Sequence, residues 1–157
     1  MNKNHFLEFC IFLLLFVVCS CHFHNETNHI KKEAILGTWA NLSMQVTFQK
    51  KDSIFKVPEG QWENILKIKP ILTTYYPEGR YESKYYNLMD SLLFTSEGNW
   101  ELKGDSLYLK EAGIITTYHV FLDLPKATFT GQLDWDQDGD SAEVYQGVQI
   151  KIINTKD

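Results

Sequence analysis

The residues whose types and spacing most directly suggest chemistry are the five carboxylates within positions 134–143. Three aspartates alternate with other residues and a glycine follows, which is the D-x-D-x-D-G order of a calcium-binding loop. Like charges this close together repel one another unless a cation neutralises them. If calcium binds, we expect its ligands to be the side chains of Asp134, Asp136, Asp138 and Glu143 together with the carbonyl oxygen of Asp140.

This ligand set is incomplete when it is compared with known calcium loops. Tyr145 stands where a twelve-residue loop has its bidentate glutamate, so Glu143 would have to substitute. Ala142 stands where the shorter loops have an aspartate. Two interpretations therefore stay open, a calcium site and a solvated acidic turn between two strands, and no other cofactor is expected.

His119 is the one histidine of the sequence beyond position 29. An imidazole with a pKa near neutrality could act as a general base, and Asp123 lies near enough in sequence to orient it. The sequence has no G-x-S-x-G, no H-E-x-x-H and no nucleotide-binding glycine loop. A single histidine on a half-polar strand is more often exposed or hydrogen-bonded, so the sequence does not predict an enzyme.

The elements that must position these residues are short segments in which apolar and polar residues alternate. A period of two predicts strands, here at 35–48, 53–57, 71–76, 80–86, 91–95, 99–103, 106–110, 114–124, 127–135 and 144–152. Helix-like spacing occurs at 61–66. Turn residues between neighbouring segments predict an all-β fold, an antiparallel up-and-down barrel of about eight strands, because closure removes exposed edges. An open sandwich is the alternative.

A barrel of eight strands leaves room for packed side chains alone or for one small ligand. Alternation puts Tyr75 and Tyr76 on opposite faces, and likewise Tyr85 and Tyr86, so one member of each pair faces inward. Large amphipathic side chains suit the wall of a binding cavity. The candidate ligand-binding residues are Trp62, Tyr76, Tyr81, Tyr85 and Tyr118. The same aromatic residues are equally compatible with a filled core.

The first twenty residues have the organisation of a signal peptide. Lys3 lies in a short polar head, and the apolar run at 9–18 is too short to span a bilayer, which takes about 20 apolar residues. The sequence Val18-Cys19-Ser20-Cys21 resembles the lipobox of bacterial lipoproteins. That resemblance implies cleavage before Cys21 and acylation of its sulfur. Residues 21–33 are polar and aperiodic and predict a flexible tether, and 34–157 predict one β-barrel domain.

Two motifs within the domain carry a further resemblance. Gly37-Thr38-Trp39 resembles the Gly-x-Trp signature of the lipocalins, and 98–107 resembles a hairpin common in bacterial lipocalin-like lipoproteins of the kind frequent in Bacteroidota. In lipocalins the tryptophan closes the barrel floor under a basic side chain from the last strand. The resemblance implies that Gly37, Trp39 and Lys151 form this floor, although lysine lacks the planar guanidinium of arginine.

The formal net charge of −5 argues against nucleic acid as a partner. The mature chain would keep Cys21 alone, so no disulfide framework is expected. Together the resemblances imply a protein that is lipid-anchored to the outer membrane of a bacterial envelope through Cys21. The expected function is binding of a small hydrophobic ligand. The alternatives are a solid barrel that presents its loops to another envelope protein and, third, a lipocalin-type enzyme that uses His119.

Overall fold

The computed structural model describes residues 30–153. The predicted signal peptide, Cys21 and most of the predicted tether lie outside the described residues. The described chain begins with Ile30, which packs against the core, and continues into the short helix α2 (Lys32–Ile35), whose Ile35 is fully buried. Among the residues from 30 to 153, no helix is long and apolar enough to cross a membrane.

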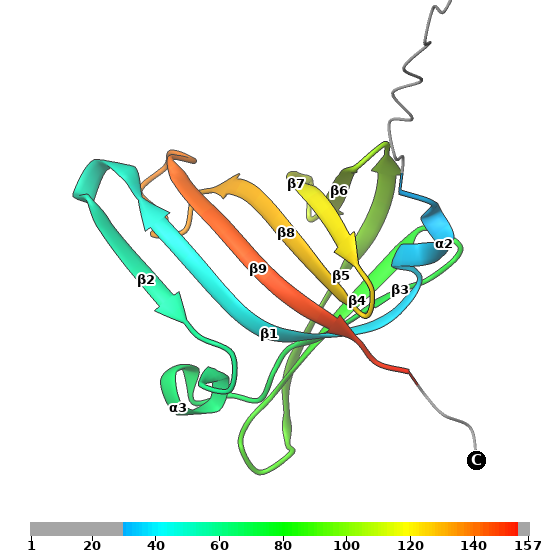
Figure 1. The fold of residues 1–157 in the computed structure, drawn as a ribbon, viewed down its shortest axis with the longest axis horizontal. Coiled ribbons are helices and arrows are strands. Elements are labelled where there is room, and N and C mark those ends of the chain that lie inside the picture. The colour runs from blue at the N-terminus through cyan, green and yellow to red at the C-terminus, as the bar shows by residue number, and fades with distance from the viewer. Residues whose placement is uncertain (1–29, 154–157) are drawn as a thin grey trace, which may run out of the picture.

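The described residues form one antiparallel sheet that closes on itself (Figure 1). Its nine strands are β1 (Gly37–Phe48), β2 (Ser53–Val57), β3 (Leu72–Tyr75), β4 (Arg80–Tyr86), β5 (Leu92–Lys103), β6 (Ser106–Glu111), β7 (Ile114–Asp123), β8 (Lys126–Leu133) and β9 (Glu143–Lys151). Pairing of β1 with β9 closes a barrel of eight strands, and β2 lies outside it on the edge of β1. The predicted all-β antiparallel barrel is confirmed, whereas the alternative of an open sandwich is wrong.

Strand β1 pairs with three other strands because it is long and irregular. Its first residues pair with β3, its last residues pair with β2, and β9 follows it along the other side. The register shifts between Asn41 and Ser43, where one extra residue forms a bulge. A bulge reverses the alternation of faces, so both Trp39 and Met44 are buried although five positions separate them.

The barrel has two unlike ends. The closed end carries α2 and the turns at 77–79, 104–105 and 124–125. The opposite end, which we call the mouth, carries the short helix η1 (Gln49–Lys51), the β4–β5 hairpin loop, the β6–β7 turn and the acidic loop at 134–142. In Figure 1 α2 lies at the right and the β1–β2 hairpin at the left.

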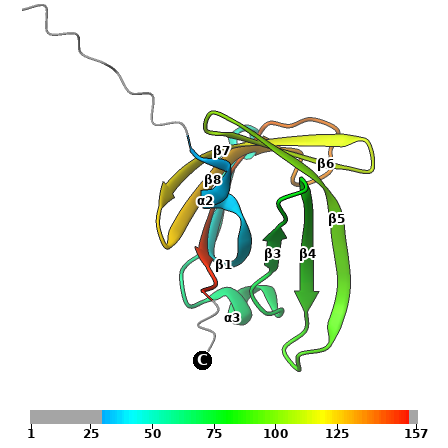
Figure 2. The same ribbon diagram turned by 90° about the vertical axis from the view of Figure 1, so that its right-hand side faces the viewer.

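The helix-like spacing at 61–66 forms one short helix, α3 (Trp62–Leu66), near the mouth half of β1. Figure 2 shows α3 at the foot of β3, beside the projecting β4–β5 hairpin. Trp62 of α3 packs with Met44, Val46 and Val57 in a small cluster. A larger cluster fills the closed end and consists of Ile35, Trp39, Tyr75, Tyr81, Trp100, Leu107, Val120, Ala127 and Phe129.

Candidate functional site

A cavity of about 480 Å³ lies inside the barrel, above the closed-end cluster and open toward the mouth. Its wall includes five tyrosines that come from four strands: Tyr75 of β3, Tyr81 and Tyr85 of β4, Tyr118 of β7 and Tyr145 of β9. Hydroxyl and amide side chains lie between the rings. The wall therefore combines aromatic area with many hydrogen-bonding groups.

Three glycines within strands leave space for three of these rings, namely Gly98 for Tyr81, Gly131 for Tyr118 and Gly147 for Tyr145. A Cβ atom at Gly98 would lie 2.9 Å from Tyr81 Cε1 and 2.2 Å from the carbonyl oxygen of Lys110. A Cβ atom at Gly147 would lie 2.1 Å from the Tyr145 hydroxyl. A glycine inside a strand marks such a close approach, so these positions fix where the rings lie.

Glu111 is the charged side chain among the described residues that line this cavity. It ends β6 at the mouth and is exposed to solvent. Its carboxylate accepts hydrogen bonds from the Tyr81 hydroxyl at 3.0 Å and from Ser96 Oγ at 2.8 Å. Two partners on neighbouring strands therefore hold the carboxylate in one orientation.

The tyrosine hydroxyls of the cavity are neutral at physiological pH. Burial raises the pKa of Tyr118 to about 12. Burial likewise raises the pKa of Tyr75 and of Tyr145, and nearby tyrosines add to both increases. For Tyr81, burial is again the main cause of a raised pKa, followed by the hydrogen bond to Glu111. These phenols can therefore donate hydrogen bonds to a bound molecule.

Deeper in the cavity the wall is polar. The hydroxyls of Thr73 and Ser83 share a hydrogen bond of 2.8 Å across β3 and β4. Asn41, at the bulge of β1, is 5% exposed and faces the cavity. In the described part of the chain Gln149 Oε1 is buried without a hydrogen-bond partner, which costs free energy unless a bound molecule or water satisfies it.

The structure brings together three of the five aromatic residues proposed as ligand-binding residues. Tyr81, Tyr85 and Tyr118 all line the cavity. Tyr76 lies outside the cavity, where the Arg80 guanidinium is 3.9 Å from its ring centroid, and Tyr75 takes the inward position. Trp62 lies in the small cluster with β1 and β2, 4% exposed, and does not reach the cavity.

Sequence reasoning missed Tyr145 and Glu111. In β9 the aliphatic Val148 and Ile150 are the more obvious candidates for the inner face. Tyr145 and Gln149 line the cavity instead, so alternation puts the aliphatic residues on the outer face. The signal that could have identified Tyr145 is Gly147, two residues later on the same face. Glu111 ends a strand beside a turn and carries no distinguishing sequence signal.

The closed end contains the three residues of the expected barrel floor. Trp39 has no solvent exposure, and its Nε1 donates to the carbonyl oxygen of Ile35 at 2.7 Å. Lys151 Nζ lies 5.3 Å from the centroid of the Trp39 ring and donates to the carbonyl oxygen of Ala34 at 2.8 Å. Burial lowers the pKa of Lys151. Gly37 has φ +102°, and a Cβ atom there would lie 3.5 Å from Lys151 Cε.

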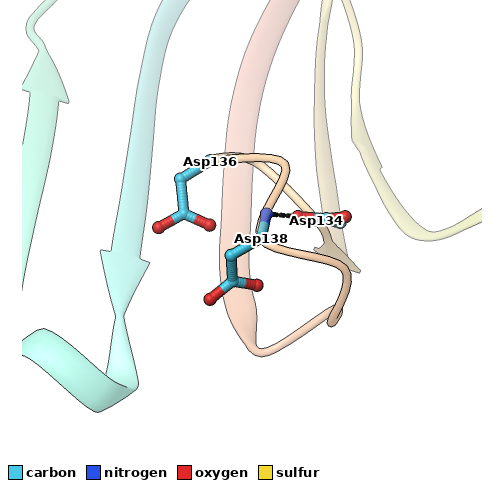
Figure 3. Close-up of side chains that lie close together, drawn as sticks. All are labelled: Asp134, Asp136 and Asp138. Carbon is cyan, nitrogen blue, oxygen red and sulfur yellow. Dashed lines mark hydrogen bonds between the residues drawn. The ribbon is translucent and has the colours of Figure 1, made fainter.

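The acidic loop joins β8 to β9 at the mouth (Figure 3). One carboxylate oxygen from each of Asp134, Asp136 and Asp138 lies within 4.8 Å of the other two. The carboxylate of Asp134 accepts hydrogen bonds from the backbone N–H groups of Asp138 at 3.0 Å and Gly139 at 3.1 Å. Asp134 therefore already stabilises the turn of its own loop.

Two lysines of η1 neutralise other carboxylates of this loop. Lys50 pairs with Asp140, and Lys51 pairs with Asp136, which lowers the pKa of Asp136. Glu143 is 2% exposed and accepts a hydrogen bond from the backbone N–H of Trp135 at 3.1 Å. Of the predicted side-chain ligands, the structure thus gathers Asp134, Asp136 and Asp138, and leaves Glu143 outside the cluster.

His119 lies on the outer face of the barrel. Its Nε2 is 2.8 Å from Asp105 Oδ2, and its side chain is 65% exposed. Alternation along β7 places it opposite Tyr118, which lines the cavity. The carboxylate beside it is therefore that of Asp105, not that of Asp123, and the imidazole does not face the cavity.

No family model matches this chain, and no curated protein is similar to it. The closed antiparallel barrel of eight strands is consistent with a lipocalin-like fold. Because a barrel of this type hosts many functions, its function has to be argued from the cavity itself.

Proposed function

We propose that this protein is a lipid-anchored binding protein of the bacterial envelope, whose barrel takes up one small molecule. The observation that carries the proposal is the cavity of about 480 Å³ among five tyrosines, which opens at the mouth. Ligand sites in proteins are concave spaces of this order, about 300–1,000 Å³, with aromatic walls and a few converging polar groups. A solid barrel would have filled this space with side chains.

The wall favours a ligand that is not purely hydrophobic. An apolar molecule would leave Gln149 Oε1 and the Thr73–Ser83 pair without new partners in a dry site. A molecule with an apolar body and hydrogen-bonding groups at its edge matches the tyrosine rings and their hydroxyls together.

Binding without chemical conversion agrees with the side chains of the cavity. His119 faces the opposite side of the sheet, and the cavity tyrosines keep their protons at physiological pH. Glu111 at the exposed mouth can accept hydrogen bonds from a ligand. We therefore propose a binding protein and not an enzyme, with no role for nucleic acid.

The proposed anchor is the lipid on Cys21, at the outer membrane. The described chain begins at Ile30 beside the closed end, so a tether that arrives there leaves the mouth at the far end of the barrel. Changing Cys21→Ala should move the protein from the membrane fraction to the soluble fraction. Unchanged fractionation would contradict the anchor and leave the barrel's binding role to be judged separately.

The experiment for the binding role is native mass spectrometry of the protein purified from its own envelope. Thr116→Trp fills the cavity, because Thr116 lines it, and Thr117→Trp puts the same ring on the outer face of β7 as a control. The wild type and Thr117→Trp should carry a small molecule, and Thr116→Trp should be bare. A bare wild type, or equal occupancy in all three proteins, would refute the proposal.

One observation favours a second function, docking of another envelope protein at the mouth. The β4–β5 hairpin exposes five large apolar side chains: Leu88, Met89, Leu92, Leu93 and Phe94. Exposed apolar side chains that gather in this way often mark an interaction surface. In this alternative the protein should lose a co-purifying partner when Met89 and Leu93 are both changed to Ser, while native mass spectrometry finds no small molecule.

A further inference from the structure

The charge of the cavity wall limits which molecules the cavity can hold. Among the described residues on this wall there is no lysine, arginine or histidine, and Glu111 supplies the one formal charge. An anionic ligand would face this carboxylate with no cation to balance it. The wall therefore disfavours fatty acids and other carboxylates.

Glu111 is oriented to receive a donor. The Tyr81 hydroxyl and Ser96 Oγ already donate to its oxygens, at 3.0 Å and 2.8 Å. An ionised carboxylate accepts about four hydrogen bonds, so lone pairs stay free. A positively charged N–H group would form a charge-assisted hydrogen bond with them, whereas a quaternary ammonium group, which has no N–H, would be attracted to the carboxylate by charge alone.

The rings supply a second contact for the same ligand type. Tyr118 and Tyr145 meet at 67° with centroids 5.8 Å apart, and Tyr75 and Tyr81 meet at 39° with centroids 6.4 Å apart. All four rings line the cavity, and the face of an aromatic ring carries negative π-electron density. A cation within about 6 Å of such a face is attracted by it, and groups of aromatic rings recognise ammonium ligands in this way.

Resting on the proposed binding role, we infer that the natural ligand is an organic cation, an amine or a quaternary ammonium compound with an apolar body. Its charged nitrogen would lie near Glu111 and the tyrosine rings, and its apolar body would fill the rest of the cavity. The neutral phenols contribute ring faces and hydroxyl donors without adding further charge.

The test is calorimetric titration of the mature protein with three probes of one shape. Choline is the cation, neohexyl alcohol is its neutral analogue with carbon in place of nitrogen, and tert-butylacetate is an anion of similar size. Choline should bind at least about tenfold more tightly than the alcohol, and tert-butylacetate should not bind. Equal affinity for choline and the alcohol, binding of the anion, or no binding of choline would overturn the inference.

A charge-removing variant separates the carboxylate from the rings. Glu111→Gln keeps an acceptor for Tyr81 and Ser96 but removes the charge, so choline should bind about tenfold more weakly and neohexyl alcohol should bind as before. Glu97→Gln, on the outer face of β5, is the matched control and should leave choline binding unchanged. Equal weakening in both variants would contradict a role for Glu111.

The ring contribution has its own variant pair. Tyr118→Phe keeps the ring face and should retain choline binding, whereas Tyr118→Leu should weaken it about fivefold. Circular dichroism checks that both variants fold. If choline does not bind while native mass spectrometry still shows a cavity-bound neutral molecule, the inferred cationic ligand is wrong and the proposed binding role is supported.

Discussion

The two ends of this barrel are built from the same strands, but the interior of one end is packed with side chains and the interior of the other is open. At the closed end, Trp39 is fully buried, Trp100 Nε1 donates to the carbonyl oxygen of Tyr76 at 3.0 Å, and Lys151 covers the floor. At the mouth, Glu111 and the polar wall remain open to solvent or a ligand. The polar groups named at the sealed end are paired within the protein, whereas Glu111 at the mouth keeps lone pairs that a ligand can use.

The largest effect should come from removing the floor tryptophan. Trp39→Ala leaves a large cavity in the closed-end core and should lower the free energy of unfolding by about 3–5 kcal/mol. Tyr85 borders space that is already open, so Tyr85→Ala should lower the free energy of unfolding by less than about 2 kcal/mol. Urea unfolding of both variants measures the two losses in the free energy of unfolding. Equal losses would contradict the difference in packing between the two ends.

An intermediate loss in the free energy of unfolding should appear at alkaline pH. An unfolded tyrosine ionises near pH 10, whereas burial raises the pKa of Tyr118 to about 12 in the folded protein. The stabilisation is therefore complete below pH 10 and is lost as pH rises toward 12, at about 1.4 kcal/mol per pH unit for each such tyrosine. In Tyr118→Phe the free energy of unfolding, measured by urea unfolding at each pH, should fall less steeply between pH 10 and pH 12. An unchanged pH dependence would show that this hydroxyl is not buried.

The smallest effect should come from calcium. Because Lys50 and Lys51 neutralise carboxylates of the acidic loop, calcium should shift the thermal midpoint by less than about 1 °C. Differential scanning calorimetry with calcium and with chelator measures the shift. A rise of several degrees with calcium, absent in Asp136→Asn, would show instead that the loop holds the ion and that the lysines give way to it.

The barrel could be predicted from the sequence because alternation and turn residues are local signals. β5 is one continuous strand although Glu97-Gly98 divides the pattern, since Gly98 makes room for the Tyr81 ring instead of forming a turn. The inward member of the Tyr75–Tyr76 pair depends on the register of β3 against β1. The bulge after Asn41 changes which later residues of β1 face inward, and alternation alone does not reveal it either.

The site was less predictable because its contacts join distant segments. The spacing of the aspartates suggested calcium, yet the lysines that pair with them lie on the β1–β2 hairpin, 85 and 90 positions earlier. Likewise, the Glu111 carboxylate gains its orientation from Tyr81 and Ser96 on two other strands. Pairings of this kind arise only once the sheet has closed.

Thiol accessibility in the folded protein tests most directly whether a hollow mouth lies over a sealed floor. Ser83→Cys places a thiol on the cavity wall and Ala127→Cys places one in the closed-end core; the unsubstituted protein is the blank for Cys21. Both sites have little exposure, 7% for Ser83 and 1% for Ala127. A small thiol reagent should modify Cys at 83 without unfolding and Cys at 127 only as fast as the protein unfolds. Equally slow reaction at both sites would show that the mouth is not hollow.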